Sequence, residues 1–147
     1  MIKIIFVCHG NICRSTMAES ICRQMCEQHH ISAEIDSAAT HYDAIGMGMY
    51  YPAREKLQEK KVPIGNHRAR ILKKSDYEYF DYIIGMDDEN MYNIRRITGD
   101  DKDNKVYKLL TFAGKSRDVA DPWYTGDFET TYQDLIEGLE AFLKTIE

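Results

Sequence analysis

"FVCHGNICRST", residues 6–16, joins a run of strand-forming residues to a segment with helical periodicity. The run at 2–7 (IKIIFV) predicts a buried strand, because uninterrupted β-branched and aromatic residues are typical of one. From Thr16 to about His29, apolar residues recur at helical spacing, and Thr16 followed by Glu19 predicts a capping box, with Ser15 as an alternative N-cap. The quoted stretch is therefore predicted to be a loop between the carboxyl end of a strand and the amino end of a helix.

The rest of the chain alternates between predicted strands and predicted helices. Further strands are predicted at 33–40, 82–86 and 105–110, and helices from Pro52 to about Lys61, over 75–80, from about Asp88 to Ile97 and from about Glu129 to Ile146, with a loop at 118–128. Such alternation favours a parallel sheet covered on both faces. We therefore expect an α/β fold: a four-stranded parallel sheet flanked by helices on both faces, a flavodoxin/Rossmann-like, three-layer α/β/α arrangement.

The topology of such a sheet predicts where the functional residues lie. Right-handed crossovers place the carboxyl ends of all parallel strands at one edge. The first loop, Ser37, Asp87 and the loop after the fourth strand should therefore lie together.

Length and charge narrow the classes of function. A chain of 147 residues predicts a single domain over 1–147. The net charge of −5 disfavours nucleic acid as the main partner. No stretch reaches the roughly 18–20 apolar residues that a membrane span needs, and the apolar N-terminus is too short for a signal peptide. We expect a cytoplasmic protein that is a monomer or a weak dimer and binds neither membrane nor nucleic acid.

All four cysteines lie in the first 26 residues: Cys8, Cys13, Cys22 and Cys26. They cannot link the remainder of the chain, so reduced thiols with local chemistry are favoured over a disulfide framework.

The first loop combines features that suit an anionic ligand. Unpaired backbone N–H groups and the helix dipole favour an oxyanion at a strand–loop–helix junction. Gly10 is expected to let the chain curl into a nest, and Arg14 offers a planar fork for two phosphate oxygens. The same positive field favours the thiolate of Cys8, which would face a bound phosphorus atom as a nucleophile.

This constellation resembles the low-molecular-weight protein tyrosine phosphatases. The matching motifs follow one another along nearly the whole chain: VCHGNICRS at 7–15, DSA at 36–38, HRAR at 67–70, GMDDEN at 85–90 and DPWY at 121–124. The resemblance implies hydrolysis of phosphotyrosine and aryl phosphates without metal or other cofactor. Phosphotyrosine-containing proteins or peptides would be the partners, and inorganic phosphate the product and an inhibitor.

The resemblance assigns three catalytic roles. Cys8 would form a phosphocysteine intermediate, and Arg14 would bind the phosphoryl oxygens and stabilise the transition state. Asp121, stiffened by Pro122, would protonate the leaving phenolate and then activate the hydrolytic water. From the residues alone, Asp121 is better read as an ordinary turn residue before proline, and only the resemblance favours the acid role.

Further residues receive binding or supporting roles by the same resemblance. Phosphate and substrate binding would involve His9, Gly10, Asn11, Ile12, Cys13, Ser15, Tyr42, Trp123 and Tyr124, and support of the loop Asp36, Ser37 and His67. His9 would be a rim residue, and the tyrosines and the tryptophan would form an aromatic wall. Ser15 would hydrogen-bond the sulfur of Cys8, and Cys13 would pair with Cys8 in a reversible disulfide.

Within this support, the resemblance places Asn11 in a strained conformation. Ser37 and His67 would secure Asn11, and Asp36 would pair with His67.

Three alternatives remain beside this interpretation. An arsenate reductase on the same scaffold would need later resolving cysteines, but none follows Cys26. A metal or iron–sulfur protein would use the cysteines and His9, but their spacing lacks the paired Cys-x2-Cys of zinc sites. A non-catalytic phosphotyrosine-binding module would not require Cys8, Arg14 and Asp121 together.

Overall fold

A computed structural model describes all 147 residues and confirms the predicted three-layer α/β/α fold. The four strands are β1 (Ile2–Cys8), β2 (Ala33–Ala39), β3 (Tyr82–Gly85) and β4 (Val106–Lys108). All pair in parallel in the order β2-β1-β3-β4. This order is that of a flavodoxin-like sheet: β2 is added on one side of β1, and β3 and β4 are added on the other side.

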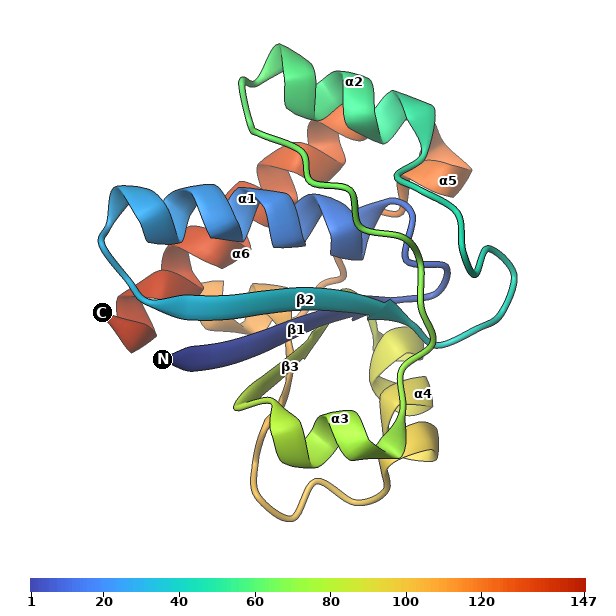
Figure 1. Cartoon of the computed structure of the whole chain (residues 1–147), viewed down its shortest axis with the longest axis vertical. Coiled ribbons are helices and arrows are strands. Elements are labelled where there is room, and N and C mark those ends of the chain that lie inside the picture. Colours follow the sequence, from blue (N-terminus) through green and yellow to red (C-terminus); the bar gives the residue numbers. More distant parts are fainter.

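Helices cover both faces of this sheet. On one side lie α1 (Arg14–Gln28), α2 (Tyr51–Glu59) and α6 (Phe128–Ile146), and on the other α3 (Lys74–Tyr79) and α4 (Asp88–Thr98) (Figure 1). The short helix α5 (Pro122–Thr125) lies near the start of α2. The loops that follow the strands meet at one edge, while the two chain termini lie at the opposite edge (Figure 1).

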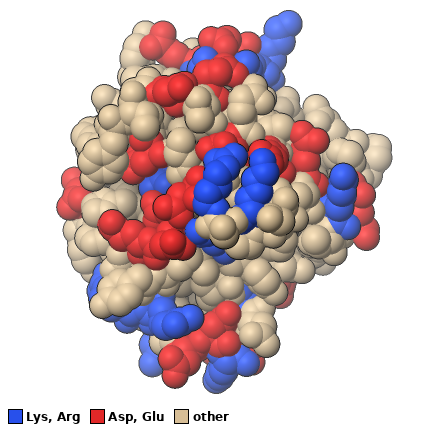
Figure 2. All heavy atoms as spheres, turned by 180° about the vertical axis from the view of Figure 1, so that it is seen from behind, with Lys and Arg blue, Asp and Glu red and all other residues tan.

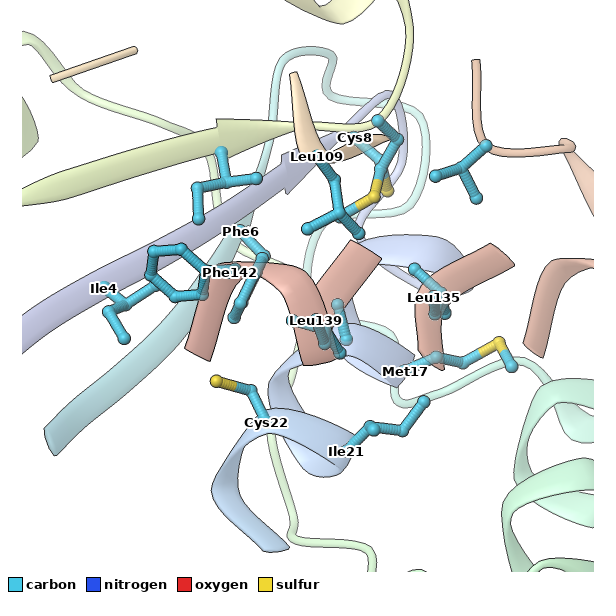
Figure 3. Packing of buried hydrophobic residues seen from close by; sticks show 14 of the residues in the cluster. Ile4, Phe6, Cys8, Met17, Ile21, Cys22, Leu109, Leu135, Leu139 and Phe142 are labelled. Carbon is cyan, nitrogen blue, oxygen red and sulfur yellow. The ribbon is translucent and has the colours of Figure 1, made fainter. Parts of the chain in front are cut away.

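The central strand β1 builds two cores, because its successive side chains point to opposite faces. Ile4, Phe6 and Cys8 belong to the large cluster beneath α1 and α6, whereas Ile5 and Val7 belong to the smaller cluster beneath α3 and α4. Figure 3 shows the first three side chains in a row along β1 that ends at Cys8. The alternation that packs the core therefore places the thiol at the buried end of the strand.

The boundaries of α1 differ from the prediction. The helix begins at Arg14, two residues before Thr16, with Cys13 at the N-cap and no side-chain cap. The predicted capping box is wrong because the Glu19 carboxylate instead accepts from the hydroxyl of Ser37, which brings β2 against α1. Because α1 begins at Arg14, this residue lies at the point where the first loop joins the helix.

Two further differences concern the second half of the chain. The strand predicted at 105–110 is shorter, because Leu109–Ala113 form a 3₁₀ helix after β4. The predicted loop at 118–128 contains α5, which starts at Pro122 and is capped by the carboxylate of Asp121. Proline at the first helical position suits such a start.

The surface mixes both signs of charge. On the face opposite that of Figure 1, basic and acidic side chains lie interspersed (Figure 2). No helix combines the length and the apolar character that a membrane crossing requires.

Gly138 gives a stability prediction, since it lies where α6 crosses the 3₁₀ helix. A methyl carbon on Gly138 would lie 2.5 Å from Cγ of the fully buried Leu109. In a helix interior alanine is normally more stabilising than glycine, but here the overpacking against Leu109 makes the substitution destabilising. We expect Gly138→Ala to lower the free energy of unfolding by about 1–3 kcal/mol in urea titrations. Adding Leu109→Ala should relieve part of this loss, whereas a stabilised single variant would contradict the packing.

Candidate active site

A cavity of about 350 Å³ opens at the sheet edge that the topology predicted. Its lining comes from the loops after β1 and β2, and from the segment before and within α5. The lining residues are Cys8, His9, Gly10, Asn11, Ile12, Cys13, Arg14, Asp43, Ala44, Met47, Tyr50, Asp121, Trp123 and Tyr124. The volume suits a small organic ligand.

The loop after β1 presents free backbone donors. None of the amides of residues 9–13 donates a hydrogen bond within the protein. Gly10 was expected to supply the unusual backbone, but the residue in the left-handed region is Asn11, with φ of 61°. A Cβ at Gly10 would make only an ordinary contact, 3.9 Å from Ile12. Curled amides of this kind form an anion-binding nest.

The side chain of Asn11 holds this conformation in place. Its Nδ2 donates to Ser15 Oγ (2.8 Å), and its Oδ1 accepts from the backbone N–H of Arg70 (3.2 Å). Nε2 of His67 lies 2.8 Å from the same Oδ1 and must donate, because that oxygen carries no proton. These bonds offset the cost of a left-handed non-glycine residue.

The supporting layer differs in one contact from the prediction. His67 secures Asn11 and faces Asp36 at 3.5 Å, as expected. Ser37, however, does not bond Asn11; its hydroxyl donates to the buried Glu19 (2.6 Å). The reason is geometric: β2 lies beside α1, so the hydroxyl meets a helix side chain before it reaches the loop.

The same layer contains three side chains whose donor atoms could group around a metal ion: Glu19, Asp36 and His67. Their carboxylates are already engaged, since Arg23 pairs with Glu19 and Arg70 with Asp36. These ion pairs explain why the two carboxylates lie together, and they fit a group of side chains that supports the loop.

Cys8 lies at the floor of the cavity and exposes 4% of its surface. Its Sγ is 3.0 Å from Ser15 Oγ. Because that oxygen already accepts from Asn11, the hydroxyl proton is free to point at the sulfur when the sulfur is ionised. The predicted contact between Ser15 and Cys8 is therefore present.

Arg14 is buried, with 3% exposure, although it carries a charge at a helix N-terminus. Its Nη2 pairs with Asp87 (2.9 Å) and Asp121 (3.2 Å), and its Nη1 donates to the carbonyl of Val119 (3.1 Å). Burial opposes the charge, but Cys8 and the two carboxylates outweigh it and raise the pKa of Arg14. The guanidinium is thus fixed beside the thiol.

Asp121 reaches the cavity from the opposite wall. Its Oδ1 accepts from the backbone N–H of Trp123 (3.0 Å), and its Oδ2 lies 3.2 Å from Arg14. The structure therefore brings Cys8, Arg14 and Asp121 into one pocket, although more than 100 residues separate the last two along the chain.

An aromatic wall borders the pocket, but its members differ from those expected. Trp123 and Tyr124 line it, and Tyr50 completes it with its ring centroid 5.1 Å from that of Trp123. Tyr42 does not line the cavity and points to solvent, with 74% of its surface exposed. No pattern near Tyr50 distinguished it from Tyr42.

His9 lies at the rim, as predicted. Its Nε2 is 2.6 Å from Asp43, and its ring stacks on that of His41 at 3.9 Å between centroids. Glu89 lies 3.6 Å from the other ring nitrogen. These contacts direct both nitrogens of His9 to exposed carboxylates at the rim.

Sequence reasoning missed two contacts, one at a catalytic candidate and one at a residue that supports the loop. Asp87 was placed at the correct edge of the sheet but not as the ion-pair partner of Arg14. Glu19 was read as a capping residue, yet it is a buried anchor for Ser37. The position of Asp87 directly after β3 was the available signal, whereas nothing in the sequence signals the contact of Glu19.

Cys13 gives a prediction about reactivity. Burial, followed by the charges of Cys8 and Asp121, raises the pKa of Cys13 to about 12. At pH 7 only about 10⁻⁵ of that thiol is ionised, so we expect iodoacetamide to modify Cys8 and to leave Cys13 intact until the pH approaches 12. Both cysteines lie in the tryptic peptide 4–14, so fragmentation mass spectrometry must locate the adduct. Equal labelling of both at pH 7 would contradict the burial of Cys13.

Comparison with known proteins identifies the family. The family model for "Low molecular weight phosphotyrosine protein phosphatase" matches residues 3–147. The low molecular weight protein-tyrosine-phosphatase YfkJ of Bacillus subtilis is 36% identical, over 100% of this chain and 97% of its own length. Its crystal structure superimposes with a TM-score of 0.95, covering 99% of this chain and 94% of that one.

Two other proteins extend the comparison. The low molecular weight phosphotyrosine protein phosphatase of Homo sapiens is 35% identical, over 97% of this chain and 94% of its own. The structure of DARP, a drosophila arginine phosphatase, is 25% identical, with a TM-score of 0.89 over 99% of this chain and 98% of that one. With its fold, its pocket and a family model that spans nearly every residue, the chain belongs to the low molecular weight phosphotyrosine protein phosphatase family.

Proposed function

We propose that this phosphatase hydrolyses phosphotyrosine and aryl phosphates through a phosphocysteine intermediate on Cys8. The observation that carries the proposal is the floor of the pocket. There a buried thiol lies below five backbone amides without partners and beside a buried guanidinium. A phosphate dianion satisfies those donors and places its phosphorus against the sulfur.

In the first step, the Cys8 sulfur attacks phosphorus while Arg14 binds two of the equatorial oxygens. The planar fork of Arg14 matches the phosphoryl group, and its charge stabilises the trigonal transition state. Asp87 keeps the fork oriented through its 2.9 Å ion pair. The Ser15 hydroxyl stabilises the sulfur as attacking group and later as leaving group.

Asp121 acts at the opposite end of the reaction axis. Protonated, it donates to the leaving phenolate; ionised, it then takes a proton from the water that hydrolyses the phosphocysteine. The capping bond from the N–H of Trp123 holds one oxygen of Asp121, which leaves the other for proton transfer. A bound phosphate offers Arg14 a stronger acceptor than Asp121, so binding frees this carboxyl group.

The pocket favours an aryl phosphate over an alkyl one. Cys8 is almost fully buried at the floor, and Tyr50, Trp123 and Tyr124 form the wall above it. An aromatic ring carries the phosphate to that depth and stacks against the wall, while a serine or threonine side chain is shorter. Phosphotyrosine in a protein or peptide is therefore the proposed substrate, and inorganic phosphate the product that competes for the nest.

Cys13 adds a proposed protection against oxidation. Peroxide converts the Cys8 thiolate to a sulfenic acid, and the Cys13 thiol then attacks that sulfur with loss of water to form a disulfide. Because burial raises the pKa of Cys13 to about 12, the second step is expected to be slow. The disulfide would return to two thiols under reduction.

A panel of matched phosphopeptides tests the proposed substrate class. Peptides of one sequence would carry phosphotyrosine, phosphoserine, phosphothreonine or phosphoarginine, with and without a chelator, and phosphate release would be measured. We expect hydrolysis of the phosphotyrosine peptide alone, unaffected by the chelator. Faster release from phosphoarginine would assign the pocket to the substrate named for DARP. Loss of activity with the chelator would contradict metal-free chemistry.

A further inference from the structure

The residue before Asp121 is held on both of its backbone polar groups by side chains of α6. The N–H of Ala120 donates to Oδ2 of Asp134 (3.0 Å), and its carbonyl accepts from the hydroxyl of Thr131 (2.8 Å). Thr131 and Asp134 are three residues apart and so share one face of the helix. Both are buried, with exposures of 0% and 6%.

The adjoining residue, Val119, is also fixed at both backbone groups. Its N–H donates to the carbonyl of Met86 at the end of β3 (2.9 Å), and its carbonyl accepts from Arg14 (3.1 Å). The loop is thus tied to the sheet at Val119 and to α6 at Ala120, directly before Asp121.

Helix α6 is a rigid support for this attachment. Leu135 and Leu139, which follow Asp134 within the next five residues of the helix, are fully buried in the large core cluster. Figure 3 shows both among the side chains packed between α6, α1 and β1. A shift of Asp134 would therefore require the core to move.

The two oxygens of Asp134 have separate partners. Oδ2 accepts from Ala120, while Oδ1 pairs with Nη2 of Arg117 at 3.0 Å. Arg117 is half-exposed, so its side chain can be removed without opening the core. A buried carboxylate is costly without partners, so the bond to Ala120 persists while the helix is folded.

We propose that Thr131 and Asp134 are positioning residues, which hold Ala120 so that the Asp121 carboxyl reaches the oxygen of the leaving group. The inference rests on the proposed acid role of Asp121. It assigns the last helix, which contributes no residue to the pocket lining, a part in proton transfer.

Four variants distinguish the loss of the bonds that hold Ala120 from a general loss of stability. Thr131→Val removes the hydroxyl at nearly constant shape, and Thr131→Ser restores it. Asp134→Ala removes the acceptor for Ala120, whereas Arg117→Gln removes the contacts of Arg117 with Asp134, Glu137 and the carbonyl of Asp118 and keeps that acceptor. Each would be assayed on phenyl phosphate, whose leaving group needs a proton, and on dinitrophenyl phosphate, whose leaving group does not.

Displacement of the acid should lower kcat/KM, which reports the first chemical step, for phenyl phosphate alone. We expect Thr131→Val and Asp134→Ala to lower kcat/KM for phenyl phosphate by about 10-fold, since small displacements of catalytic groups have effects of that order or larger. The value of kcat/KM for dinitrophenyl phosphate should not change, because its leaving group needs no proton and Cys8 and Arg14 are untouched. Thr131→Ser should recover the rate, and Arg117→Gln should match the unaltered protein.

Trp123 supplies a readout that does not depend on turnover. It is the single tryptophan of the chain and lies two residues after Asp121. We expect its fluorescence anisotropy to decay faster in Thr131→Val and Asp134→Ala, and to stay unchanged in Arg117→Gln. If Asp134→Ala does not fold, the Thr131 pair carries the same test, with circular dichroism as the check of folding.

The outcomes distinguish this inference from the function on which it rests. Equal losses of kcat/KM on both substrates, equal losses in Asp134→Ala and Arg117→Gln, or unchanged anisotropy would each overturn the positioning role. If Asp121→Asn slows phenyl phosphate selectively while the α6 variants do not, only the positioning role fails. If Asp121→Asn shows no selectivity, the acid role fails and the inference fails with it.

Discussion

Cys8→Ser is expected to abolish hydrolysis of p-nitrophenyl phosphate, with a fall in kcat of about 10⁵-fold or more. Serine keeps the size and a hydrogen bond to Ser15, but its hydroxyl is not ionised near neutral pH and has no base beside it. The amides of residues 9–13 and Arg14 remain in place. The variant should therefore still bind inorganic phosphate, measured by isothermal titration calorimetry.

Cys26→Ser is the matched control for this change. Cys26 is equally buried, but it lies in the core, with its Sγ 4.0 Å from that of Cys22, and does not line the pocket. We expect this variant to lose stability and to retain its rate at temperatures where it is folded. Turnover by Cys8→Ser would refute the nucleophile, whereas loss of phosphate binding would refute the description of the nest.

Asp121→Asn is expected to slow hydrolysis of phenyl phosphate by about 10²–10⁴-fold, the usual contribution of a general acid. Dinitrophenyl phosphate should be slowed much less in its first step, because its leaving group departs without a proton. Asparagine still accepts from the N–H of Trp123 and caps α5, so the loop should keep its shape. Values of kcat/KM, which report the first chemical step, plotted against leaving-group basicity provide the measurement.

Asp127→Asn offers a nearby control of the same charge change. Asp127 caps α6 and is exposed, and asparagine caps helices about as well as aspartate. We expect the rates of this variant to equal those of the unaltered protein on both substrates. An Asp121→Asn variant with the same slope against leaving-group basicity as the unaltered protein would exclude Asp121 as the acid.

The parts of the fold that local pattern determines were predictable. The buried strand at 2–7, the strand–loop–helix junction at Cys8 and the helix from about Glu129 to Ile146 all follow from residue spacing, and the structure contains each of them. Parallel topology then brought the loop after β1 and the segment with Asp121 to one edge. These features depend on periodicity and chain handedness, which the sequence displays directly.

The remaining details depend on contacts between distant segments. Glu19 has the spacing of a capping residue, but its position against β2 gives it Ser37 as a partner instead. Tyr50 rather than Tyr42 completes the aromatic wall, because the path of the loop after β2 decides which ring faces the pocket. Neither outcome is encoded in local spacing.

Asp134 illustrates the same limit for catalysis. In the sequence it is one polar residue on a helix whose apolar stripe is clear. Only the three-dimensional structure shows that its carboxylate bonds the residue before Asp121. Positioning residues of this kind have no motif, since their partner is a backbone group.

Rapid quenching of turnover in acid, followed by fragmentation mass spectrometry of the tryptic peptide 4–14, tests the covalent step most directly. We expect one phosphoryl group on Cys8, transient in the unaltered protein and more abundant in Asp121→Asn, because that variant lacks the base for hydrolysis of the intermediate. Peptide that remains unmodified throughout turnover would contradict nucleophilic attack by Cys8.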